Sequence, residues 1–236
     1  MQSHHIVRAY DGELAMLGNR IAAMGGHAER MVEQAVAALI NSDVDLAQKV
    51  IADDVVLDEG QRWIDDRAIV LIAKRQPMAD DLREIVGTIR ISADLERVGD
   101  LGKNIAKRVV AVVDARQPIR FFRGLEALSN LALTQLKQVL DVYASRGVDG
   151  IGFVRDRDEE IDAMYTSLFR ELLTYMMEDP RNISSCTHLL FCAKNIERIG
   201  DHATNIAETV YYIVTGEQMP IERPKEDKSH KVVVEG

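Results

Sequence analysis

Acidic side chains recur in pairs, four residues apart, at four places in the chain. On an α-helix, residues four apart lie one above the other, so each pair would present two carboxylates on one face. Crowded carboxylates repel each other, and a hard cation with oxygen ligands would relieve that repulsion. The candidate metal ligands are therefore Asp54, Asp58, Glu96 and Asp100 in the first half of the chain, and Asp158, Asp162, Glu197 and Asp201 in the second.

The acids continue the apolar face of their helices. An apolar stripe leads into Glu96 and Asp100, and a similar stripe leads into Glu197 and Asp201, so these carboxylates should face inward. The stripe consists of Leu82, Val86, Ile89 and Ala93 in the first half and of Leu190 and Ala193 in the second.

The expected cofactor is a divalent or trivalent metal ion, with iron, manganese, magnesium and zinc as candidates. Asn104 and Asn205, one turn beyond the acids, would add oxygen donors or partners for the ligands. The alternative is that Arg97, Arg198 and other cations neutralise the acids in ion-pair networks, without any metal.

The acid-rich motif occurs twice, 101 residues apart. Residues 96–106 read ERVGDLGKNIA and residues 197–207 read ERIGDHATNIA, with seven of eleven positions identical. The pairs that begin at Asp54 and Asp158 repeat in the same order at nearly the same offset, which indicates an internal duplication. Gly99 and Gly200 lie inside the motif, and we expect them to let another backbone approach the acids closely.

Helical periodicity accounts for the rest of each half. In the first segment, apolar residues from Leu14 to Ala38 alternate spacings of three and four, as in a heptad seam. The spacing predicts six long helices, over residues 10–40, 44–74, 78–113, 125–145, from the turn at 147–152 to 177, and 183–214. The fold class is therefore all-α, with two tandem three-helix bundles at residues 1–118 and 119–216 and a flexible tail at 217–236.

Composition excludes several classes of protein. The net charge is −9 and the pI is near 5.2, which argues against nucleic acid as a partner. No apolar run approaches the roughly 20 residues that span a bilayer, and the N-terminus shows no signal-peptide pattern. We expect a cytoplasmic protein without membrane insertion, in which Cys186 and Cys192 are reduced and packed as small apolar residues.

Motifs of known catalytic sites are missing. The sequence has no Glu-x-x-His motif of di-iron bundles, no phosphate-binding glycine loop and no zinc spacing of Cys or His. The chain is therefore expected to be a binding or regulatory module and not an enzyme. Two alternatives stay open, a metal-dependent hydrolase of phosphate compounds and a purely structural helical scaffold.

The duplicated motif closely resembles that of the PhoU family. The resemblance also covers the segments RQPMADDLR at 75–83 and MEDPRNI at 177–183. It implies a regulator of bacterial phosphate uptake that restrains the phosphate ABC transporter, through its ATPase subunit, and a phosphate-sensing histidine kinase when phosphate is plentiful. It also implies a homodimer, peripheral at the inner membrane through its partners, and metal clusters at the eight acids named above. Lys103 departs from the second copy and places an ammonium near the first site.

Overall fold

The computed structural model describes residues 2–113 and 119–219, and this part of the chain is almost entirely helical. The helices are α1 (Gln2–Asn41), α2 (Val44–Asp53), α3 (Val55–Arg75), α4 (Asp80–Val112), α5 (Ile119–Ser145), α6 (Ile151–Glu178) and α7 (Ile183–Thr215), with a 3-10 turn at Pro180–Asn182 before α7. The predicted all-α class with two helical repeats is confirmed. The predicted tail at 217–236 and the boundary near 118 fall mostly outside the described residues, and the boundaries stay predictions.

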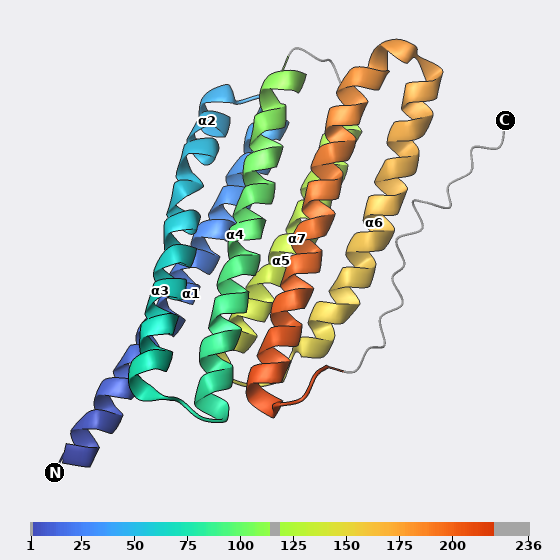
Figure 1. Cartoon of the computed structure of the whole chain (residues 1–236). Helices are drawn as coiled ribbons and strands as arrows, with labels where there is room; N and C mark the ends of the chain where they lie inside the picture. The colour runs from blue at the N-terminus through green and yellow to red at the C-terminus, as the bar shows by residue number, and fades with distance from the viewer. Residues whose placement is uncertain (1, 114–118, 220–236) are drawn as a thin grey trace.

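Two three-helix units stand side by side (Figure 1). The first consists of α1, the α2–α3 pair and α4, and the second of α5, α6 and α7. The units meet where α4 packs along α7 and α1 packs along α5, while the α2–α3 pair and α6 lie on opposite outer edges (Figure 1). The third helix of each unit therefore has its outer-edge neighbour on one side and the other repeat on the other.

The predicted second helix is not continuous, because a turn at Asp54 separates α2 from α3. The Leu57 amide donates to the Asp54 carbonyl at 3.0 Å, a tighter turn than that of an α-helix. The Asp53 carbonyl instead accepts from His27 Nε2 on α1 at 3.1 Å. Periodicity alone could not show this break, because the donor that satisfies the freed carbonyl lies 26 residues away.

Helix ends follow local signals where the sequence provides them. The Asp43 carboxylate accepts from the Leu46 amide at 2.9 Å and caps α2, and Gly216 takes a left-handed conformation (φ 76°) at the end of α7. The predicted start of the fourth helix at Leu125 is wrong, since α5 already begins at Ile119. Its first turn is held by Phe121, which is fully buried with its ring 5.2 Å from that of Tyr175.

The core is aliphatic, as the low aromatic content suggests. All eight residues of the predicted heptad seam on α1 are buried, namely Leu14, Leu17, Ile21, Met24, Ala28, Met31, Ala35 and Ala38. Cys186 and Cys192 are buried free thiols on α7, and burial raises the pKa of Cys192 to about 12. None of the described helices is long and apolar enough to cross a membrane.

Candidate metal centre

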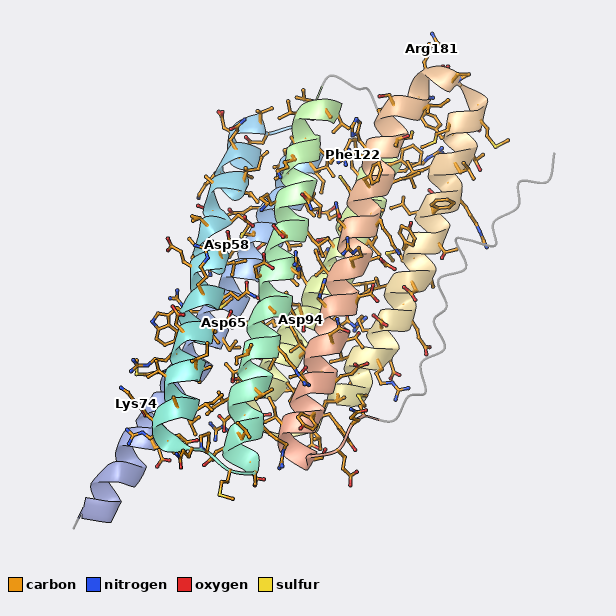
Figure 2. The ribbon with its side chains drawn as sticks, in the orientation of Figure 1. Asp58, Asp65, Lys74, Asp94, Phe122 and Arg181 are labelled. Atoms are coloured by element: carbon orange, nitrogen blue, oxygen red, sulfur yellow. The ribbon has the colours of Figure 1, made fainter. Side chains whose placement is uncertain are left out.

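The first set of acids lies between the α2–α3 pair and α4. Asp54 is buried at the break between α2 and α3, and Asp58 lies in the first turn of α3, on the side of α4 (Figure 2). Glu96 and Asp100 come from the middle of α4, which packs along α3. Gly99 lies between them, and a Cβ there would overlap Leu57 Cδ1. The glycine thus admits a side chain of α3, whereas we expected a backbone.

Lys103 bridges the two helices within this set. Its Nζ lies 2.5 Å from Asp54 Oδ2 and 2.6 Å from Asp100 Oδ1, with only about a fifth of the lysine side chain exposed (21%). Burial alone would lower the pKa of Lys103, but the hydrogen bonds to Asp100 and Asp54 outweigh it and raise the pKa above the usual lysine value. The ammonium is therefore charged and offsets two carboxylates at once.

Arginines contact the other acids of the first repeat. Arg97 lies with Nε 3.6 Å from Glu96 Oε2 and NH1 3.4 Å from Asp100 Oδ2. The Arg62 guanidinium lies 3.7 Å from Asp58 Oδ2, and because the arginine side chain is largely exposed, this pair contributes little to stability. Burial, followed by the neighbouring Asp100, raises the pKa of Glu96 despite Arg97. A cation of the protein itself thus contacts each of the four predicted ligands in this repeat.

The second set lies between α6 and α7 and differs at one decisive position. Asp158 and Asp162 lie on α6, and Glu197 and Asp201 lie on α7. Thr204 stands where Lys103 stands in the first repeat, 101 residues earlier. Its hydroxyl donates to Asp158 Oδ1 at 3.1 Å, as Lys103 does to Asp54, but it brings no charge.

Gln135 supports this arrangement from α5. The side chain is fully buried, and its Nε2 donates to Thr204 Oγ1 at 3.1 Å and to the Val154 carbonyl at 2.8 Å. It lies three residues after Ala132 and four before Val139, both buried, and so shares their inward face. A polar residue at that spacing is the signal in the sequence that could have identified it.

Glu197 is the most perturbed acid of the second set. Only 5% of its side chain is exposed, and Lys194 Nζ lies 2.7 Å from Oε1. The other oxygen, Oε2, is buried and has no hydrogen-bond partner among the described residues. Burial raises the pKa of Glu197 to about 7; Lys194 partly opposes the shift, and Asp201 and Asp162 add to it. A buried carboxylate oxygen without a donor is costly, so this position calls for a proton or a cation.

The two repeats therefore differ in how well they fit a metal. Across residues 2–113 and 119–219, no three acidic, histidine or cysteine side chains converge closely enough to coordinate an ion as they stand. In the second repeat the unpartnered Glu197 oxygen and the carboxylates of Asp158, Asp162 and Asp201 are donors of the type that a hard cation prefers, and a bound ion would have to draw them together. In the first repeat the Lys103 ammonium already lies between Asp54 and Asp100, so the residues present do not fit a metal there.

Two residues that support the second carboxylate set were not identified from the sequence, and the histidine next to Asp201 lies outside the set. Lys194 and Gln135 were not considered, although Lys194 precedes Glu197 by three residues, a spacing that places both on one helix face. His202 directly follows Asp201, but its Nδ1 lies 2.8 Å from Asp94 Oδ1 of α4, and Figure 2 shows Asp94 on the side of α4 that faces α7. His202 thus joins the two repeats and does not enter the carboxylate set.

A helical repeat of this kind, present twice and carrying carboxylates on its third helix, defines a known class of all-helical domain. The family model described as "PhoU domain" matches residues 21–109 and again 125–210. The chain therefore belongs to the PhoU family, and the resemblance noted in the sequence is confirmed.

Relatives match over nearly the full length. The chain is 68% identical to the phosphate-specific transport system accessory protein PhoU homolog of Rhizobium meliloti, over 96% of each chain. It is 48% identical to the protein of the same name from Caulobacter vibrioides, over 95% of this chain and 98% of that one.

Solved structures share the fold as well. The crystal structure of PhoU from Pseudomonas aeruginosa superposes with a TM-score of 0.84 at 36% identity, covering 88% of this chain and all of the other. The phosphate transport system regulatory protein PhoU from Streptococcus pneumoniae gives a TM-score of 0.83 at 27% identity, over 90% and 100% of the two chains.

The perturbed pKa of Glu197 makes a prediction for stability in metal-free protein. The folded-state pKa near 7 lies above the usual glutamate value of 4.5, so the folded chain holds this proton more tightly than the unfolded chain does. The resulting stability is present below pH 4.5 and is lost as the pH rises through 7. Between pH 4.5 and 7 the free energy of unfolding of the parent should fall by on the order of 3 kcal/mol, and that of Glu197→Gln should not show this fall. Urea unfolding of both proteins between pH 5 and 8 measures the difference, and parallel pH profiles would contradict the assignment.

Proposed function

We propose that this chain is a non-enzymatic regulator of phosphate uptake and phosphate-responsive signalling. The observation that carries the proposal is the full-length match to proteins named as accessories of the phosphate-specific transport system, with both PhoU repeats present. The regulator would act in the cytoplasm as a homodimer, restraining the ATPase subunit of the phosphate ABC transporter and a phosphate-sensing histidine kinase when phosphate is plentiful. It would reach the inner membrane only through these partners.

Deletion of the gene from its native host tests this role. Without the regulator, phosphate uptake and kinase output should stay high in phosphate-rich medium, because nothing restrains either partner. Uptake of radiolabelled phosphate and a reporter of the kinase pathway measure the two outputs, and re-expression of the chain should restore both. Normal repression in the deletion strain would contradict the role, and so would robust phosphoester turnover by the purified metal-loaded protein.

The proposal includes a metal, assigned to the second repeat. Asp158, Asp162, Glu197 and Asp201 would hold it. The Asn205 amide does not join them, because its Nδ2 lies 3.5 Å from Asp94 Oδ1 of α4, on the side of the other repeat. A bound hard cation would supply positive charge to crowded carboxylates and so tie α6 to α7. The support is the buried Glu197 oxygen that lacks a donor, together with a neutral threonine where the first repeat has a lysine. The ammonium at this repeat position bridges both helices of the first set, whereas Lys194 of the second set lies on the same helix as Glu197, the acid it contacts.

Exchanging the residues at this position tests the assignment. Thr204→Lys would place an ammonium beside Asp158, as Lys103 lies beside Asp54, and should abolish metal binding by the parent's site. Lys103→Thr removes the charge that bridges Asp54 and Asp100 and should add a site in the first repeat. Each protein is loaded with Fe²⁺, Mn²⁺, Mg²⁺ or Zn²⁺ and desalted, and elemental analysis then measures the metal bound per chain. Equal metal content in the parent and both variants would refute the assignment. Arg181→Gln is the control, because it also removes an arginine from an ion pair, that with Asp179, which involves none of the eight acids.

A further inference from the structure

A basic pocket lies where the two repeats meet, and none of the eight acids lines it. It is formed by the C-terminal half of α4 and the N-terminal half of α7, and its volume is about 410 Å³. The side chains that give it its chemistry are Asn104, Lys107, Arg108, His188, Phe191 and Asn195. A volume of this size is at the lower end of the range of small-molecule sites.

The helix segments around the pocket carry no acid. Residues 101–112 of α4 contain three cations and residues 183–195 of α7 contain one lysine and one histidine, without a single Asp or Glu, in a chain of net charge −9. Lys103 and Lys194 are engaged by the acids of the two carboxylate sets. Lys107 and Arg108 form no ion pair with any carboxylate of the described residues, so their charges are available to the pocket.

Arg108 is held in place by neutral groups. Its guanidinium lies over the ring of Phe191, 4.4 Å from the centroid, and its NH1 lies 3.1 Å from His188 Nδ1. Because an arginine can only donate, Nδ1 accepts and the neutral His188 ring carries its proton on Nε2. Neither contact cancels the arginine charge, so the guanidinium is oriented and keeps the rest of its donors for a ligand.

The duplicated fold supplies an internal comparison. Shifted by 101 residues, the position of Lys107 is taken by Glu208, and that of Asn195 by Asp94. At that related place on the α4–α7 contact, Asp94 accepts from His202 at 2.8 Å. At the end of the contact near His202, an acid thus accepts from the local donor. At the end that forms the basic pocket, the donors of Lys107 and Arg108 meet no acid of the described residues. The basic residues of the pocket are therefore particular to this end of the contact and are not repeated at the other.

We propose that this pocket binds the phosphate group of a small molecule, either inorganic phosphate or a phosphorylated metabolite such as a nucleotide. Lys107, Arg108 and the amide groups of Asn104 and Asn195 would donate to the phosphate oxygens. The half-exposed ring of Phe191 lines the same hollow and would cover an organic portion of the ligand. The proposal depends neither on the metal nor on the regulatory role.

Calorimetric titration of the full chain, stripped of metal and kept at low ionic strength, tests the site with inorganic phosphate and adenosine monophosphate as probes. Removal of metal prevents phosphate from binding through an ion at the carboxylates. The parent should bind at least one probe saturably. Arg108→Gln and Lys107→Gln should each weaken binding by about tenfold or more, since each removes a charged donor. Arg90→Gln is the matched control, because Arg90 also lies over a ring between α4 and α7, that of Tyr212, and it should bind as the parent does.

The two probes distinguish the source of the phosphate. Comparable affinity for both shows that free phosphate suffices, and binding of adenosine monophosphate alone shows that the ligand needs an organic portion. Lys107 is exposed, so its variant remains informative even if Arg108→Gln fails to fold. No saturable binding of either probe by the parent overturns the proposal, as does equal binding by the parent and a folded Lys107→Gln variant.

Discussion

Carboxylates crowded between two packed helices are the constraint around which each repeat is built. The third helix of a repeat presents an inward-leaning Glu and Asp, and the helix beside it presents two more acids. Such groups cannot all stay charged in a partly buried groove without donors or cations nearby. The first repeat meets this need with Lys103 and arginines. The second meets part of it with Lys194, Thr204 and a raised Glu197 pKa.

The contact between α4 and α7 links the two carboxylate sets, because each helix carries the acids of its own repeat. The same two helices carry the acids toward their outer neighbours and form the contact between repeats. Occupancy of a carboxylate set would therefore act on a helix that also packs against the other repeat. His202 on α7 already contacts Asp94 on α4 across this boundary. The basic pocket lies on this contact too, and Arg108 and Phe191 both line it. A regulator that answers to more than one signal would need its sites on elements held in common.

Much of this arrangement could be predicted from the sequence because its signals are local. Three-and-four spacing identified the buried seam of α1, and the 101-residue period identified the duplication. Contacts between distant segments could not be predicted in this way. The break at Asp54 depends on a donor from His27, and the bridging role of Lys103 depends on Asp54, which is 49 residues away. The period did align Lys103 with Thr204, so the difference between the repeats was visible, but its geometry was not.

We propose that the Lys103 ammonium, which bridges the two helices of the first carboxylate set, takes the place of a metal there, and that the second set, with Thr204 at the same repeat position, takes a metal. Anomalous X-ray diffraction from crystals of the protein loaded with Fe²⁺ or Mn²⁺ tests it most directly, because the signal locates the ion itself. We predict a peak beside Glu197 and Asp201 and none between Asp54 and Asp100, where Lys103 Nζ should be found instead. Peaks of equal height in both repeats, or a peak in the first repeat alone, would contradict the account.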